Sequence, residues 1–172
     1  MNLVLVGYRG TGKTAVAQIL AEQFELRTVH LDAEIEKRSG GSTIPEIVKD
    51  VGWPGFRDIE EEVVRAFAAQ DGLVIDCGGG VVEREANFET LRKAGPVVWL
   101  KASPETVVRR IEGGDQRPSL TGTKSFTDEV AEVLERRTPL YRRLAHLEVD
   151  TDSLNVAQVA AEVRRQVEAM ST

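Results

Sequence analysis

The segment Gly7 to Thr14, which reads GYRGTGKT, constrains the fold more than any other part of the chain. It matches the pattern G-x-x-x-x-G-K-[ST], in which backbone N–H groups surround phosphate oxygens, the lysine adds a charge and the hydroxyl can ligate Mg²⁺. The apolar run Leu3 to Val6 is typical of a buried strand, and helix-forming residues follow from Ala15 to Phe24. A strand, a glycine loop and a helix in this order predict a nucleotide-binding P-loop, with phosphate contacts from Gly10, Thr11, Gly12, Lys13, Thr14 and Ala15.

Short apolar runs recur along the chain and alternate with amphipathic segments of helical length. This alternation predicts an α/β fold in which a five-stranded, parallel, doubly wound sheet carries helices on both faces. At 172 residues the chain is most simply one domain, 1–172. The five expected strands are Leu3 to Val6, Thr28 to Leu31, Leu73 to Asp76, Val97 to Leu100 and Leu147 to Val149.

Two helices are expected between the second and third strands, in a substrate-binding helical region of about residues 32–70. Thr43 to Glu46 has the form of a capping box and starts a helix toward Val51, and a second helix runs from about Pro54 to Gln70. The polar, glycine-rich stretch 112–125 has no periodicity and is interpreted as a mobile lid. Helices are also predicted near 127–144 and 155–169, the last one packing Val156, Val159, Val163 and Val167.

The overall charge excludes some classes of partner. The chain has 22 Lys and Arg against 28 Asp and Glu, a net charge of −6, so its surface should repel nucleic acid and anionic membranes. Cys77 is the only cysteine, which excludes an internal disulfide, and the apolar runs are too short to span a bilayer. With no signal-type segment before the glycine loop, we expect a cytoplasmic protein.

Several polar residues fall where a doubly wound sheet gathers side chains, at the carboxyl ends of its strands. An aspartate there can accept a hydroxyl proton, arginine binds a carboxylate in fork geometry, and a glycine triplet exposes backbone N–H groups. Together these groups suit a small anionic molecule that accepts the phosphate. They are Asp32 after the second strand, Arg57, the triplet Gly78, Gly79 and Gly80 after the third strand, and Arg117 and Arg137 in and after the expected lid.

The same residues carry a resemblance to the shikimate kinases. The motifs GYRGTGKT, LDAEIEKRSG, GFRDIEEEVV, CGGGVV, RPSL and RRTPLYRRLA follow one another in that family's order over nearly the whole length. The resemblance implies a three-layer P-loop kinase fold, like that of the nucleoside monophosphate kinases. It also implies ATP-dependent phosphorylation of the shikimate 3-hydroxyl, with Mg²⁺ as cofactor and ATP and shikimate as the small-molecule partners.

The resemblance further implies roles for individual residues. Asp32 resembles the residue that binds and activates the hydroxyl. Lys13 and Arg117 resemble the groups that act on the transferred phosphate. Arg57 and Arg137 resemble a clamp for the carboxylate of shikimate. Gly78 to Gly80 resemble the turn that binds this substrate. Arg110 and the loop at about 152–155 resemble the residues on the adenine side of the family's ATP site.

Each of these roles has a simpler alternative. Arg57 could pair with Glu61 one turn along a solvated helix, and the glycine triplet could be an ordinary strand exit. Arg136, Arg142 and Arg143 are interpreted as a basic helix face, an alternative that also exists for Arg137.

One position departs from the family pattern. Shikimate kinases usually carry Asp-x-Asp after the second strand, whereas VHLDAE places His30 where the first, metal-shell aspartate is expected. Because Mg²⁺ prefers oxygen ligands, a neutral imidazole is a poor direct substitute. We expect Asp76, which ends an apolar strand beside the P-loop, to supply the missing carboxylate alongside Thr14. The alternative is that Asp76 only caps the following turn.

Three functions are therefore open at this stage, and all assume a monomer. The first is a shikimate kinase, and the second is a kinase for a related acid such as quinate or aminoshikimate, which the same arginine clamp would serve. The third is a degenerate relative that senses a metabolite or nucleotide, which His30 alone supports.

Overall fold

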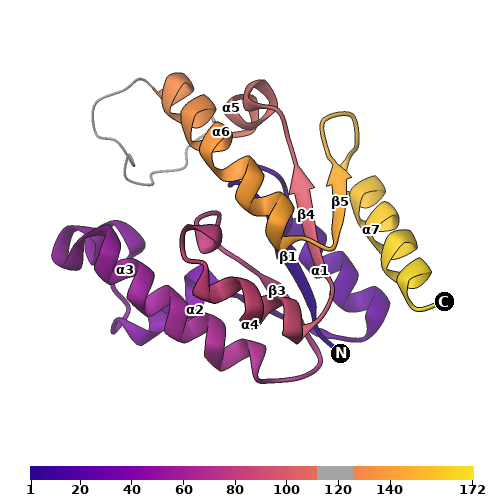
Figure 1. Cartoon of the computed structure of the whole chain (residues 1–172), viewed down its shortest axis with the longest axis horizontal. Helices are drawn as coiled ribbons and strands as arrows, with labels where there is room; N and C mark the ends of the chain where they lie inside the picture. The colour runs from indigo at the N-terminus through magenta and orange to yellow at the C-terminus, as the bar shows by residue number, and fades with distance from the viewer. Residues whose placement is uncertain (112–125) are drawn as a thin grey trace.

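The computed structural model describes residues 1–111 and 126–172, and its centre is a five-stranded parallel sheet (Figure 1). The strand order β2-β3-β1-β4-β5 places the strand before the P-loop in the middle. The prediction of a doubly wound α/β fold is confirmed. The strands are β1 (Leu3–Val6), β2 (Arg27–His30), β3 (Leu73–Asp76), β4 (Val97–Lys101) and β5 (Leu147–Asp150).

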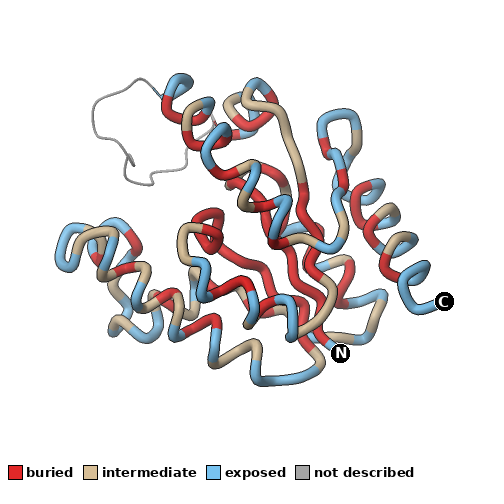
Figure 2. The backbone as a smooth tube through the Cα atoms, in the orientation of Figure 1, coloured by how far each residue is buried: buried red, intermediate tan, exposed pale blue. Residues whose placement is uncertain are grey.

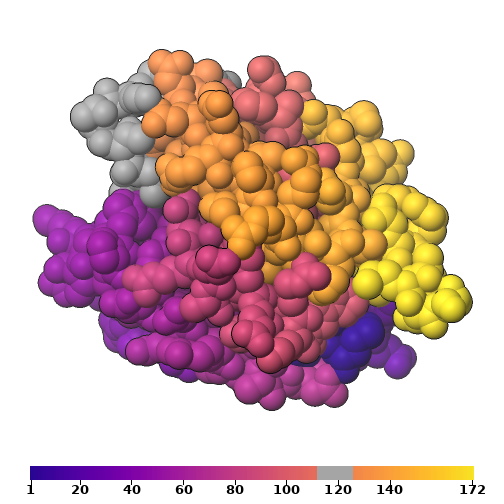
Figure 3. All heavy atoms as spheres, in the orientation of Figure 1, coloured from indigo at the N-terminus to yellow at the C-terminus, as the bar shows by residue number. Residues whose placement is uncertain are grey.

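The central strands of the sheet are buried (red in Figure 2), and different helices cover its two faces. Alternate residues of β1 point to opposite faces, so Leu3 and Leu5 join one core cluster and Val4 and Val6 the other. Helices α1 (Lys13–Phe24) and α7 (Val156–Met170) cover the first face. Helices on the second face, which Figure 3 shows in violet, magenta and orange, are α2 (Leu31–Arg38), α3 (Ile44–Ala68), α4 (Ala86–Ala94) and α6 (Phe126–Leu144).

The helical region between β2 and β3 contains α2 in addition to the two expected helices. The two expected helices form the single element α3, but Gly52 has φ 71° and ψ 173°, so the helical path breaks there and Pro54 stands in the first turn of the second part. Thr43 accepts a hydrogen bond from the backbone N–H of Glu46, as the capping pattern predicts.

The second strand begins and ends one residue earlier than predicted. It ends at His30, and Leu31 already belongs to α2, so Asp32 lies in the first turn of a helix. A helical first turn fixes the carboxylate of Asp32 more firmly than a loop would. In α7, Val159, Val163 and Val167 are buried as predicted, but Val156 is exposed because it is the first residue of the helix.

The order of the strands determines where a ligand can bind. The loop after β1 and the turn after β3 leave the same edge of the sheet from neighbouring strands, which is where doubly wound sheets bind ligands. The 3₁₀ turn η1 (Val81–Glu83) follows the glycine triplet there, and α5 (Pro104–Ile111) follows β4. The predicted lid, 112–125, and Arg117 lie outside the described residues. No helix in the described part of the chain is long and apolar enough to cross a membrane.

Candidate active site

The P-loop after β1 forms one wall of a cavity that we call the phosphate pocket. Gly10 and Gly12 take positive φ angles of 80° and 88°, which turn the loop toward the start of α1. Lys13 is folded over the loop, and its Nζ donates to the carbonyls of Gly7 at 2.7 Å and Tyr8 at 3.0 Å. The cavity has a volume of about 610 Å³, and its lining includes Gly10, Gly12, Lys13, Thr14, Ala15, His30, Asp32 and Asp76. Backbone donors and a cation thus meet at a helix N-terminus, an arrangement that binds phosphate.

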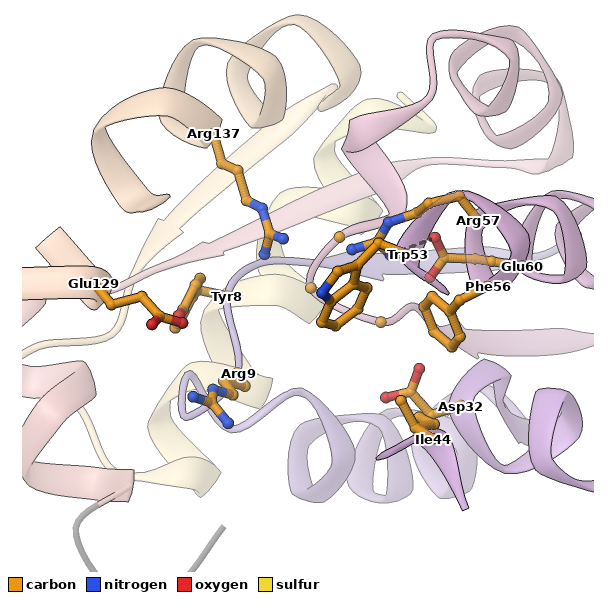
Figure 4. A pocket seen from close by; sticks show the side chains of 13 residues that line it. Tyr8, Arg9, Asp32, Ile44, Trp53, Phe56, Arg57, Glu60, Glu129 and Arg137 are labelled. Atoms are coloured by element: carbon orange, nitrogen blue, oxygen red, sulfur yellow. Dashed lines mark hydrogen bonds and ion pairs between the residues drawn. The ribbon is translucent and has the colours of Figure 1, made fainter. Parts of the chain in front are cut away.

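A second cavity, the acceptor pocket, lies between α3, α6 and the turn after β3 (Figure 4). The two cavities share a wall, because Arg9, Asp32, Gly78 and Gly79 line both. A group held in one pocket can therefore reach a group held in the other. The residues that line the acceptor pocket include Asp32, Trp53, Phe56, Arg57, Glu60, Gly78, Gly79, Gly80 and Arg137.

Arg57 enters the acceptor pocket from α3 and is not the solvated residue of the simpler alternative. Its side chain is only 11% exposed, and Nη1 donates to Glu60 Oε1 at 2.8 Å. The guanidinium lies over the rings of Trp53 and Phe56, 5.3 and 5.1 Å from their centroids. Glu61 instead faces Arg65, so the alternative pairing of Arg57 with Glu61 is not formed.

Glu60 is a residue of this pocket that the sequence analysis missed. It is 1% exposed, and this burial raises the pKa of its carboxyl group against the opposing influence of Arg57. The hydrogen bond between the two fixes one edge of the Arg57 guanidinium (Figure 4). The sequence does place Glu60 three residues after Arg57, a spacing at which side chains on a helix can pair. Glu61, four residues after Arg57, has an equally suitable spacing, so the sequence could not decide between them.

Arg137 comes from α6, on the other side of the pocket, and is 4% exposed. Its Nε donates to Glu83 Oε1 at 2.7 Å, and its guanidinium lies 5.7 Å from the centroid of the Tyr8 ring. Partial burial would raise the pKa of Glu83, but the hydrogen bonds from Arg136 and Arg137 lower it below its usual value. With Nε used by Glu83, the terminal amino groups point toward the pocket (Figure 4).

The neighbouring arginines of α6 behave as the basic helix face that the sequence analysis expected. Side chains of Arg136, Arg142 and Arg143 are 49%, 56% and 57% exposed, and each pairs with a glutamate. Arg137 therefore differs from them in burial.

Space restricts two positions of the glycine triplet, because Gly78 and Gly80 lie tightly against predicted site residues. A Cβ atom on Gly78 would come within 2.6 Å of Asp32 Oδ1, and one on Gly80 within 2.1 Å of Arg57 Nη2. At Gly79 such an atom would make only ordinary contacts, 3.4 Å from the Arg9 backbone nitrogen and 3.5 Å from Arg137 Nη1. None of the three has a positive φ, so at Gly78 and Gly80 close approach of side chains, not backbone freedom, disfavours other residues. An ordinary strand exit would not need this.

Replacing Gly80 with alanine should therefore damage the acceptor pocket more than the fold. The added methyl group must displace the guanidinium of Arg57 from the rings and from Glu60, and we expect the KM for the acceptor to rise about 10-fold or more. Steady-state kinetics with each substrate varied would measure it. Gly40→Ala is the control for general destabilisation, since it strains a residue with φ 71° that lines neither pocket and has nothing within 4 Å of its Cβ position. Equal acceptor KM values in wild type and Gly80→Ala would contradict the packing argument.

Asp76 lies at the end of β3, in the phosphate pocket, and its contacts differ from those of a turn cap. Its Oδ2 accepts hydrogen bonds from Thr14 Oγ1 at 2.8 Å and lies 2.9 Å from His30 Nδ1. Both partners are side chains on neighbouring segments, not backbone groups of the turn that follows. Because the Thr14 hydroxyl uses its hydrogen for Asp76, the lone pairs of its oxygen remain for a cation. This donor set fits a hard divalent cation held together with nucleotide phosphates.

The structure offers no self-sufficient metal site in the part of the chain that it describes. Within 1–111 and 126–172, no three His, Cys, Asp or Glu side chains are grouped to hold a metal ion. A cation at Thr14 and Asp76 would therefore need phosphate oxygens and water as its remaining ligands, as Mg²⁺ in kinases commonly does.

The predicted adenine side forms a separate hollow next to the P-loop. Arg110 donates to Thr151 Oγ1 at 3.0 Å and to the Thr151 carbonyl at 2.8 Å, and it also reaches the Gly10 carbonyl at 3.3 Å. Leu154 and Asn155 line the same hollow. The structure thus joins Arg110 to the loop after β5, as predicted.

Comparison with known proteins gives a consistent result. A family model described as shikimate kinase matches residues 9–168. A shikimate kinase of Rhodopirellula baltica is 42% identical over 94% of this chain and 88% of its own length, and one of Pseudomonas putida is 39% identical over 97% and 96%. The solved shikimate kinase of Acinetobacter baumannii in complex with shikimate superposes with a TM-score of 0.92 at 32% identity, covering 98% of this chain and 93% of that one.

Proposed function

Because this chain belongs to the shikimate kinase family, we propose that it transfers the γ-phosphoryl group of ATP to the 3-hydroxyl of shikimate, giving shikimate 3-phosphate and ADP. The observation that carries the proposal is the shared wall of the two pockets. Asp32 lines both the cavity of the P-loop and the cavity that contains Arg57 and Arg137. An acceptor hydroxyl beside Asp32 would thus lie at the boundary that the phosphoryl group has to cross.

The two arginines of the acceptor pocket suit the carboxylate of shikimate. Arg137 is buried, the side chain of Arg57 is only 11% exposed, and the two come from different helices; each is held on one edge by a glutamate. Their charged donors are therefore oriented before substrate arrives, which reduces the entropy lost on binding. Trp53 and Phe56 provide an apolar wall for the ring.

Asp32 is assigned to the acceptor hydroxyl and Lys13 to the phosphates. The carboxylate of Asp32 packs against Gly78 at the common wall, so it can accept the hydroxyl proton as the oxygen attacks phosphorus. Lys13 is held at the loop by carbonyl groups and has a flexible stem with which to follow the phosphate charge. Arg117 is proposed from the family resemblance alone as a further ligand of the transferred phosphate.

Mg²⁺ is the proposed cofactor, and Thr14 and Asp76 are the residues that would hold it. When bound, it neutralises charge on the β- and γ-phosphates during transfer. The Thr14 hydroxyl would be a direct ligand, since its hydrogen already points to Asp76. The Asp76 carboxylate would bind the ion or its water.

Replacing Asp76 with asparagine should raise the Mg²⁺ concentration for half-maximal activity about 10-fold and lower kcat, because the site loses its carboxylate charge. Activity titrated with Mg²⁺ at saturating ATP and shikimate measures both. Asp58→Asn, a change at an exposed aspartate paired with Arg84, is the control. An unchanged Mg²⁺ requirement in Asp76→Asn would refute this part of the site.

The direct test of the function is a coupled ADP-release assay with shikimate, quinate and aminoshikimate as acceptors. We expect the largest kcat/KM with shikimate. A larger value with quinate or aminoshikimate would reassign the acceptor. Binding of shikimate or ATP without ADP release would favour a sensor.

We also propose that the chain works as a monomer in the cytoplasm. In support, the residues proposed for both substrates come from a single chain.

A further inference from the structure

We propose that His30 is a positioning residue for the cation of the phosphate pocket: its imidazole holds the carboxylate of Asp76 in a fixed orientation beside Thr14. The inference rests on the proposed function, since it concerns the cation that accompanies ATP. It assigns a role to the residue that departs from the family's Asp-x-Asp pattern.

The sheet places His30 and Asp76 side by side. They are register partners in the parallel pair β2 and β3, and each is the last residue of its strand. Neighbouring strands lie about 4.8 Å apart. Of these two strands, β3 is the one that adjoins β1 and the P-loop. A carboxylate at position 76 is therefore one strand nearer to Thr14 than a carboxylate at position 30 would be.

The contacts of Asp76 use its two oxygens unequally. Thr14 Oγ1 and His30 Nδ1 both contact Oδ2, at 2.8 and 2.9 Å, and neither contact involves Oδ1. Two partners from different segments prevent the carboxylate from rotating about its Cβ–Cγ bond. Oδ1 is then the oxygen left for a cation or for water bound to it.

The chemistry of the pair defines the state of the histidine. An ionised carboxylate only accepts hydrogen bonds, so Nδ1 of His30 must carry the proton. The side chain of Asp76 is 8% exposed and that of His30 is 36% exposed, so the imidazole lies on the solvent side of the pair. Because Mg²⁺ prefers oxygen ligands, the imidazole acts through Asp76 and not as a ligand. Groups that orient a metal ligand in this way commonly raise metal affinity about 10-fold or more.

The tautomer of His30 can be measured in the unmodified protein. The chain has only two histidines, and His146 provides an internal control because its Nδ1 accepts a hydrogen bond from the Val97 N–H. Burial also lowers the pKa of His146, so at pH 8 it is neutral with its proton on Nε2. Long-range ¹H–¹⁵N spectra at pH 8 should show a protonated Nδ1 for His30 and an unprotonated Nδ1 for His146. An unprotonated Nδ1 at His30 would overturn the proposal.

The effect on the cation is tested with Mn²⁺ as the probe and ADP as the nucleotide. Electron paramagnetic resonance gives the Mn²⁺ affinity of the protein–ADP complex. We expect His30→Ala and His30→Phe to weaken the Mn²⁺ affinity about 10-fold, because both remove the hydrogen-bond donor. Of the two, His30→Phe keeps an aromatic ring at this position. His30→Asn offers an amide N–H near the position of Nδ1 and should recover most of the affinity. Metal-free binding of ADP should not change.

Two results of this titration would overturn the proposal. One is wild-type Mn²⁺ affinity in His30→Phe, and the other is no gain of His30→Asn over His30→Ala. The titration contains no shikimate, so it separates this inference from the proposed function. If the chain phosphorylated no acceptor, the Mn²⁺ result could still hold; if it were an active kinase, the Mn²⁺ result could still fail.

Discussion

Replacing Asp32 with asparagine is expected to lower kcat by about 100-fold or more, because the amide keeps the shape of the side chain but cannot accept the hydroxyl proton. Asp32 stands in the first turn of α2, and its carboxylate lies against Gly78. Asparagine has the same size, so the replacement should fit without rebuilding the pocket. The measurement is steady-state kinetics with ATP and shikimate each varied. Effects on the KM values should be much smaller than the effect on kcat.

The matched control for this variant lies on the same helix. Glu34 also stands in the first turn of α2 but pairs with Lys37 at the surface, so Glu34→Gln should keep nearly full activity. A near-wild-type kcat in Asp32→Asn would mean that Asp32 only binds the acceptor. An equal loss in Glu34→Gln would indicate damage to α2 instead of the loss of a proton acceptor.

Replacing Arg137 with alanine is expected to raise the KM for shikimate about 10- to 100-fold while changing the KM for ATP about twofold or less. The reason is that a charge-assisted hydrogen bond to a buried carboxylate contributes about 1.5 to 3 kcal/mol. Arg57→Ala should behave in the same way from the opposite side of the pocket. Kinetics at saturating ATP with shikimate varied measure the change.

The chain offers a close control for Arg137. Arg136 is the preceding residue and binds the same oxygen of Glu83, but it is exposed. Arg136→Ala therefore removes an equal charge and a contact to Glu83 without entering the acceptor pocket. If Arg136→Ala raised the shikimate KM as much as Arg137→Ala, general electrostatics would explain the result and the clamp assignment would fail.

Sequence patterns predicted the parts of the site that depend on local order. The P-loop, its strand and its helix are contiguous, so GYRGTGKT specified their arrangement directly. The glycine triplet and Arg137 were predicted with the help of family motifs, and the structure shows that Gly78 and Gly80 lie tightly against Asp32 and Arg57. Their roles in binding remain proposals.

Other parts of the site depend on packing, which the local sequence does not encode. Glu60 and Glu61 are adjacent carboxylates on one helix, and only the position of that helix decides that Glu60 is buried against Arg57. Likewise, Asp76 could be predicted as a metal-shell carboxylate, but its contact with His30 follows from the register of two strands that α2 and α3 separate in sequence. Residues 112–125, with Arg117, stay a prediction from sequence.

The account is tested most directly by identifying the product that forms when the protein is incubated with ATP, Mg²⁺ and shikimate. Nuclear magnetic resonance of the mixture would locate the new phosphate ester on the ring, while ADP is counted in parallel. We predict one shikimate 3-phosphate for every ADP formed, with no reaction when shikimate is left out. ADP without a phosphorylated ring, or a phosphate on a different hydroxyl, would contradict the placement of the acceptor at Asp32.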